Sequence, residues 1–97
     1  MPEPLRHLFW DYSFDHLRWA DHRDLITFRV LDRGGWTDIE TLLTLLSPAD
    51  LRAFFFRTHG RGISARTLRY FEAALDLPHQ TVTDWLADPN SRIWRAR

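Results

Sequence analysis

Apolar side chains recur every three or four positions along most of this chain, which is the spacing of one face of an α-helix. Residues 19–33 show this spacing among charged residues and are followed by Gly34 and Gly35, a typical helix stop. The next apolar stripe follows Thr37 and Glu40, which lie three residues apart and can each cap the backbone at a helix start. The pattern therefore predicts helices over residues 19–33 and 37–46.

The second half of the chain follows the same pattern. Residues 47–50 read Ser-Pro-Ala-Asp, which favours a helix start, and the helix that they begin ends in the glycine-containing segment 58–62. Ser64 can cap a further helix that reaches Asp76, and a short helix follows over residues 80–87. No segment alternates polar and apolar residues as a strand does. We therefore predict an all-α fold, a compact bundle of four or five short helices.

The N-terminal hook, residues 8–17, is the most distinctive segment. It reads Leu-Phe-Trp-Asp-Tyr-Ser-Phe-Asp-His-Leu, so it concentrates aromatic side chains and aspartates in a short stretch. Phe9, Trp10 and Phe14 can each bury a large apolar area, whereas the aspartates suit turns and helix starts. We expect the hook to fold back onto the helices.

The composition of the chain allows one modest core. With 97 residues, of which 44% are hydrophobic, the chain has the size of a single domain, 1–97. The 13 basic side chains, all of them Arg, balance 13 acidic ones, and this neutrality argues against binding to nucleic acid or membranes by bulk charge alone. Cysteine is absent, and we recognise neither a signal peptide nor a membrane span, so we expect a cytoplasmic protein without membrane contact.

None of the candidate catalytic groups forms a recognised motif. Asp11 and Asp15 could pair as acid and base, but carboxylates in turns are far commoner. His16 and His22 do not have the spacing with which two histidines bind a metal from one helical face. The glycines lack the flanking residues of a phosphate-binding loop. We therefore predict no enzyme, no cofactor and no metal site.

Residues 57–72 concentrate positive charge in an otherwise neutral chain. A helix, a glycine-containing turn and a second helix form a helix-turn-helix, and residues 63–72 resemble the second helix of MerR-type regulators. In this interpretation the DNA contacts come from Arg61, Arg66, Thr67, Arg69 and Tyr70. The other interpretation is a solvated amphipathic helix that follows an Arg-rich loop.

Three segments, residues 8–17, 22–26 and 29–34, resemble a family of small bacterial proteins of unknown function. The likeness extends to the Ser-x-x-Thr-Leu helix that begins at Ser64, so that it spans residues 8–78 and leaves 79–97 as a short helix and tail. Members of this family are often encoded beside AbiEii-type nucleotidyltransferase toxins. The resemblance therefore implies an antitoxin-like protein.

Two functions stay open at this point. The first is an antitoxin-like protein of a toxin-antitoxin system, which binds and neutralises a nucleotidyltransferase-type toxin through aromatic and charged anchors. The partner-binding residues that we expect are Phe9, Trp10, Asp11, Phe56 and Trp94. The alternative is a helix-turn-helix DNA-binding protein that regulates its own operon by binding operator DNA. The two functions do not exclude each other.

Overall fold

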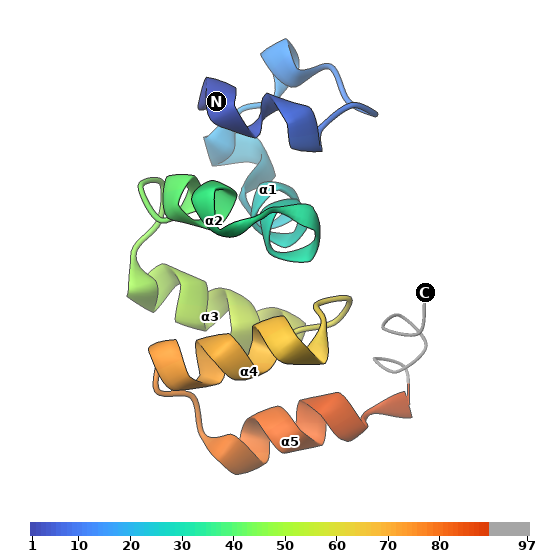
Figure 1. Cartoon of the computed structure of the whole chain (residues 1–97), viewed down its shortest axis with the longest axis vertical. Helices are drawn as coiled ribbons and strands as arrows, with labels where there is room; N and C mark the ends of the chain where they lie inside the picture. The colour runs from blue at the N-terminus through green and yellow to red at the C-terminus, as the bar shows by residue number, and fades with distance from the viewer. Residues whose placement is uncertain (90–97) are drawn as a thin grey trace. The chain divides into compact units, whose positions relative to one another are not determined.

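Every regular element in the computed structural model is a helix (Figure 1); the structure describes residues 1–89. Two short 3₁₀-helices, η1 (Glu3–Leu8) and η2 (Phe14–His16), come first. They precede five α-helices: α1 (Trp19–Arg33), α2 (Trp36–Leu42), α3 (Pro48–Thr58), α4 (Ala65–Ala74) and α5 (His79–Ala87). No strand occurs between residues 1 and 89, and the predicted all-α class is confirmed. The chain divides into two compact units, an N-terminal unit (Met1–Ser47) and a C-terminal unit that begins at Pro48.

The N-terminal unit has its core where η1 meets α1 and α2, both of which it contacts. The buried apolar side chains of this unit are Leu5, Leu8, Phe9, Phe14, Leu17, Ile26, Val30, Leu31, Leu42 and Leu46. The hook supplies Phe9 and Phe14, whose ring centroids lie 6.0 Å apart. Burial of these two rings explains why the hook folds back, because each buried aromatic side chain removes about 150–250 Å² of surface from water.

Helix α1 has the predicted bounds. It begins after Arg18, whose side chain makes no cap, and the backbone departs from helical geometry at His22 (φ −130°, ψ 28°). Its end is set by close packing: a Cβ on Gly34 would lie 2.6 Å from the Val30 carbonyl oxygen and 2.9 Å from the Cβ of Asp38. Glycine is therefore needed here for space, since its φ of −78° is open to any residue.

Helix α2 begins and ends earlier than predicted. Its N-cap is Gly35, whose backbone N–H donates to the Asp38 carboxylate at 2.9 Å, so the expected pair of Thr37 and Glu40 does not form the cap. The helix stops at Leu42, because the backbone after it winds into a tighter turn than an α-helix. In that turn the Thr44 hydroxyl donates to the Thr41 carbonyl at 2.6 Å. His7 adds a contact from η1 to the start of α2, with its Nε2 3.2 Å from Asp38.

The C-terminal unit packs α3, α4 and α5 through aromatic contacts. Phe55 of α3 and Phe71 of α4 have ring centroids 5.6 Å apart. The ring centroid of Trp85 in α5 lies 5.4 Å from that of Phe56 in α3 and 5.6 Å from that of His59, the residue after α3. The predicted short helix at the end of the chain is α5, and residues 90–97 lie outside the described part.

Helix α4 starts as predicted and ends before Asp76. The hydroxyl of Ser64 accepts the backbone N–H of Thr67 at 3.2 Å, which is the expected N-cap. At the other end Asp76 adopts a left-handed conformation (φ 53°), and the N–H of Leu77 donates back to the Glu72 carbonyl at 2.9 Å. This is the bonding pattern of a Schellman stop, which Asp adopts less often than Gly, so the residue type alone did not reveal it.

Candidate functional site

The most exposed aromatic side chain of the hook, Trp10, lies over two arginines of α1. The guanidinium carbons of Arg29 and Arg33 both lie 5.1 Å from the Trp10 ring centroid. Trp10 is 66% exposed and Tyr12 is 42% exposed. We call these four residues, Trp10, Tyr12, Arg29 and Arg33, the Trp10 platform. Its aromatic rings face solvent while cations support them, an arrangement worth about 0.5–1 kcal/mol per exposed contact.

Arg29 connects the platform to the hook through hydrogen bonds. Its Nη1 donates to the Leu8 carbonyl at 3.0 Å and to Oδ1 of Asp11 at 2.8 Å, and its Nη2 donates to Oδ2 of Asp11 at 3.0 Å. The guanidinium carbon also lies 5.6 Å from the Phe9 ring centroid and 5.4 Å from that of Tyr12. One side chain of α1 therefore fixes both the backbone and the rings of the hook.

Asp11 has a structural task in this arrangement. The hydrogen bonds from Arg29 lower the pKa of the Asp11 carboxyl below its ordinary value, and the same bonds raise the pKa of Arg29. Asp11 is therefore ionised and bound within the unit. It supports the platform from the side instead of offering an unpaired charge to a partner.

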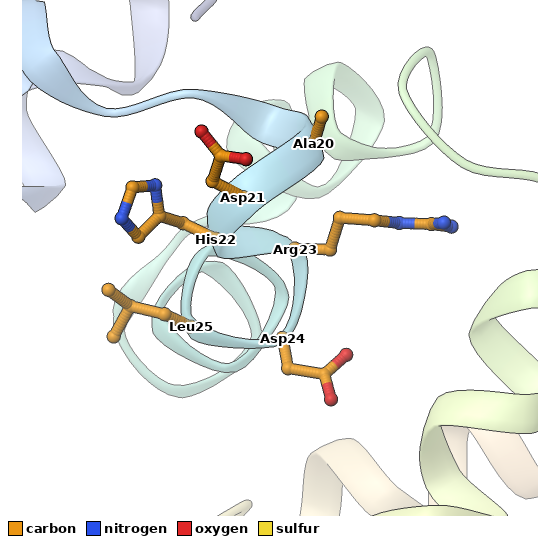
Figure 2. A pocket seen from close by; sticks show the side chains of 6 residues that line it. All are labelled: Ala20, Asp21, His22, Arg23, Asp24 and Leu25. Carbon is orange, nitrogen blue, oxygen red and sulfur yellow. The ribbon is translucent and has the colours of Figure 1, made fainter.

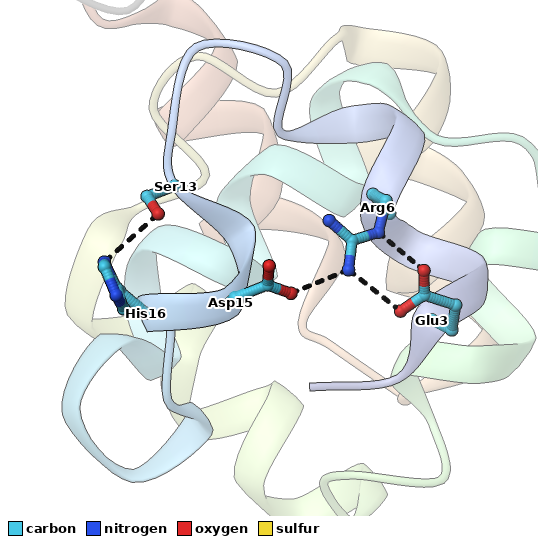
Figure 3. Close-up of polar contacts among 5 residues, drawn as sticks. All are labelled: Glu3, Arg6, Ser13, Asp15 and His16. Atoms are coloured by element: carbon cyan, nitrogen blue, oxygen red, sulfur yellow. Dashed lines mark hydrogen bonds and ion pairs between the residues drawn. The ribbon is translucent and has the colours of Figure 1, made fainter.

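A second arginine holds the other end of the hook (Figure 3). Arg6 of η1 donates to Glu3 at 2.5 Å and to Asp15 of η2 at 2.7 Å, and its guanidinium carbon lies 4.6 Å from the Phe14 ring centroid. These bonds lower the pKa of Asp15 and of Glu3. Together with Arg29, this arginine makes the hook an ordered segment.

The expected partner-binding residues thus do not all belong to one surface. Phe9 is 1% exposed, so it belongs to the core and not to a binding surface, because its ring packs between those of Tyr12 and Phe14. Phe56 belongs to the C-terminal unit, is 38% exposed and has the Arg52 guanidinium 5.0 Å from its ring centroid. Trp94 lies outside the described residues.

Sequence reasoning did not find Arg29 and Arg33. Both are charged residues on a long helix, and such residues ordinarily face water. A usable signal was present: they lie four residues apart, on one helical face, in a chain whose hook offers aromatic rings and a carboxylate.

The expected DNA-binding residues are also divided. Arg61 and Arg66 are exposed, and neither forms an ion pair within residues 1–89. Tyr70 is exposed, with an edge contact to Phe71. Thr67 is half-buried, and its side chain and backbone are both bonded to Ser64.

Arg69 is engaged inside the C-terminal unit. It donates to Glu72 at 2.5 Å and to the Thr83 hydroxyl of α5 at 3.0 Å, so it joins α4 to α5. His79 lies 3.0 Å from the same carboxylate, and bonds from His79 and Arg69 lower the pKa of Glu72. A guanidinium held in this way is poorly placed to read a base. The α3–α4 connection, residues 59–64, is also longer than the three or four residues typical of a helix-turn-helix.

A shallow hollow of about 340 Å³ lies at the start of α1 (Figure 2). Its lining is residues 20–25, and Figure 2 shows the His22 ring and the Arg23 side chain pointing to different sides of the helix. The His22 ring is bonded to the backbone of Arg18. Within the described residues, no three His, Asp or Glu side chains come together as metal ligands do. The hollow therefore does not contain a metal-binding cluster of the described residues.

Between residues 1 and 89 there is no helix with the length and apolar character needed to cross a membrane.

Comparison with known proteins gives one match. No curated protein and no solved structure matches this chain. A family of unknown function, DUF6922, matches residues 5–53, which begin in η1, include the whole hook and end inside α3. The expected membership of a family of unknown function is confirmed over those residues, which make up half of the chain. The chain belongs to the family of unknown function DUF6922.

Proposed function

We propose that this protein is an antitoxin-like protein that binds and neutralises a nucleotidyltransferase-type toxin, and that the Trp10 platform is the surface that binds it. The observation that carries the proposal is the exposed Trp10 ring held over Arg29 and Arg33. Trp, Tyr and Arg are the side chains most enriched among the few that dominate binding energy at protein interfaces. The platform supplies all three types.

The order of the platform supports binding in a second way. A partner that docks on a loose aromatic loop must immobilise it, which costs about 0.5–1.5 kcal/mol per ordered side chain. Here Arg29 already bonds the hook at Leu8 and Asp11, and Arg6 bonds it at Asp15. The platform is thus formed before a partner arrives.

The position of the platform in the chain also favours it over the other exposed aromatic residue that we expected to bind. The Trp10 platform lies within the part that matches the family, residues 5–53, whereas Phe56 lies beyond it. The nature of the toxin rests on the resemblance of the hook to proteins encoded beside nucleotidyltransferases. With such a partner, this protein would act in the cytoplasm as a binding protein that has no catalytic activity of its own.

The test is co-expression with the nucleotidyltransferase encoded next to this protein, scored by rescue of cell growth and by the Kd of the purified pair. A Trp10→Ala variant should abolish rescue and raise Kd roughly 30-fold or more, as loss of an interface anchor worth about 2 kcal/mol does. The matched control is Trp36→Ala, because Trp36 is 54% exposed in the same unit but lies on α2.

Each outcome decides the proposal. Loss of rescue by Trp10→Ala alone, with an unchanged far-ultraviolet circular dichroism spectrum, supports it. Full rescue by a folded Trp10→Ala variant, or equal loss in both variants, would remove the platform as the toxin-binding surface. Failure of the wild-type protein to bind the toxin overturns the antitoxin function itself.

A further inference from the structure

The neutral total charge of the chain conceals an uneven distribution between its two units. Residues 1–47 contain eight carboxylates and five arginines, a net charge of −3, whereas residues 48–97 contain five carboxylates and eight arginines, a net charge of +3. Within the C-terminal unit, residues 51–71 contain five arginines and no Asp or Glu. The positive excess of the second half comes from Arg92, Arg95 and Arg97, which lie outside the described residues, whereas residues 48–89 carry five carboxylates and five arginines.

Three of the five arginines in residues 51–71 lie at the connected end of the α3–α4 hairpin. Arg57 is in the last turn of α3, Arg61 is in the connecting loop, and Arg66 is in the first turn of α4. The loop joins the end of α3 to the start of α4 (Figure 1), so these three positions lie at the connected end of the two helices. We call Arg61 and Arg66 the basic loop end; Arg57, which lies beside them, already makes an interaction of its own within the protein.

The loop that carries Arg61 is anchored. Ile63 is fully buried, and its N–H donates to the Gly60 carbonyl at 3.1 Å. Gly60 has a φ of 65°, and a Cβ there would lie 2.9 Å from a methyl group of Leu68, so the loop packs tightly against α4. Arg61 therefore projects from a defined turn beside the start of α4.

The nearest carboxylate along α4 does not neutralise this charge. Glu72 is bonded to Arg69 and His79 at the opposite end of the hairpin. Arg61 and Arg66 have no carboxylate partner within residues 1–89. Exposed guanidinium groups without internal partners are the groups that bind phosphate oxygens.

We propose that the basic loop end binds the phosphate backbone of double-stranded DNA. This differs from a recognition helix in a groove, because Arg69 is held within the unit and the loop end, not the α4 face, carries the contacts. An acidic protein is the rival partner. The observations favour DNA because every Asp, Glu, Lys or Arg position in residues 51–71 is an arginine. A protein interface of this size ordinarily carries charges of both signs with an apolar centre.

The test is the salt dependence of binding to a fluorescent 20-base-pair duplex, measured by anisotropy between 50 and 200 mM NaCl. Two phosphate contacts, at a slope of about 0.9 per contact, predict that wild-type affinity falls roughly 12-fold over this range. The Arg61→Ala/Arg66→Ala variant removes both contacts, so its affinity should change little with salt and should be much weaker at 50 mM. The matched control, Arg18→Ala/Arg23→Ala, removes the same charge from the N-terminal unit and should keep the wild-type slope.

Three results would overturn the proposal. The first is no binding of the duplex at 50 mM NaCl. The second is a folded Arg61→Ala/Arg66→Ala variant whose slope equals that of the wild type. The third is binding of a fluorescent poly-glutamate peptide without binding of the duplex, which assigns the surface to an acidic protein. None of these results bears on toxin binding by the Trp10 platform.

Discussion

Arg29 and Asp11 lie 18 residues apart in the sequence and form a two-bonded ion pair, with Nη1–Oδ1 and Nη2–Oδ2 distances of 2.8 and 3.0 Å. The same guanidinium donates to the Leu8 carbonyl, and the Arg29 side chain is only 11% exposed. This pair joins the hook to α1. Its loss should therefore affect both the stability of the N-terminal unit and the position of Trp10.

Replacing Arg29 by Lys should destabilise the protein although the charge is kept. An ammonium group cannot reproduce the planar fork that bonds both Asp11 oxygens and the Leu8 carbonyl. Loss of one part-buried hydrogen bond, about 1 kcal/mol, corresponds to a fall in Tm of roughly 4–8 °C for a chain of this size. Thermal unfolding followed by circular dichroism measures it. Arg33→Lys is the control and should leave Tm nearly unchanged, because Arg33 is exposed; equal shifts in the two variants would refute this role of Arg29.

The two adjacent glycines after α1 should respond differently to alanine. Gly34→Ala places a Cβ 2.6 Å from the Val30 carbonyl oxygen, and the resulting displacement should cost about 1–3 kcal/mol. Gly35→Ala meets no atom closer than 4.0 Å, so it should cost only the smaller penalty of Ala at an N-cap, about 0.5–1 kcal/mol. Urea denaturation of both variants provides the measurement. A Gly35→Ala variant as unstable as Gly34→Ala would show that the tight packing is not at Gly34.

Ser64→Ala should shorten or fray the start of α4. The variant removes the hydroxyl that accepts the Thr67 N–H, and a lost N-cap costs about 0.5–2 kcal/mol. Ser64→Asp retains a capping oxygen and should recover most of the stability. Amide hydrogen exchange at Thr67 distinguishes the two variants: exchange should be faster in Ser64→Ala and close to wild type in Ser64→Asp. Unchanged protection in Ser64→Ala would rule out the cap.

Lowering the pH should destabilise the C-terminal unit, because it protonates the carboxylate of Glu72. Bonds from His79 and Arg69 lower the pKa of this carboxyl in the folded protein. A carboxyl with a lowered folded pKa binds more protons when unfolded, so its stabilisation is present above the unfolded pKa and disappears as pH falls through the folded one. Tm measured between pH 7 and pH 3 should therefore fall less steeply in Glu72→Gln than in the wild type. A pH profile of Glu72→Gln that matches that of the wild type would contradict the expectation.

The sequence predicted helices best where an apolar stripe and a backbone signal agreed. Helix α1 has a stripe and a glycine stop, and the start of α4 has a stripe and Ser64, so both were located correctly. Helix α2 had two competing caps, and Asp38 prevailed over Thr37 and Glu40 because its short carboxylate reaches the Gly35 N–H. The two 3₁₀-helices, η1, which ends where the hook begins, and η2 within it, lack a periodic stripe and were not predicted.

The candidate site was less predictable, because it depends on tertiary contacts. Phe9 and Trp10 are adjacent aromatic residues, yet one is buried and the other exposed. Their tertiary contacts distinguish them: Phe9 packs against the rings of Tyr12 and Phe14, whereas Trp10 lies over Arg29 and Arg33 at the surface. Arg69 likewise has the sequence context of an exposed helix residue, and its engagement with Thr83 depends on where α5 packs.

The opposite charges of the two units have a practical consequence at the bench. A sequence pI near 7.0 suggests a protein that neither a cation nor an anion exchanger retains at neutral pH. Retention, however, depends on the local charge that a surface presents to the resin, within a screening length of about 10 Å at 0.1 M salt. With −3 on one unit and +3 on the other, each resin finds a complementary half of the molecule, and the protein should be retained by both at low ionic strength.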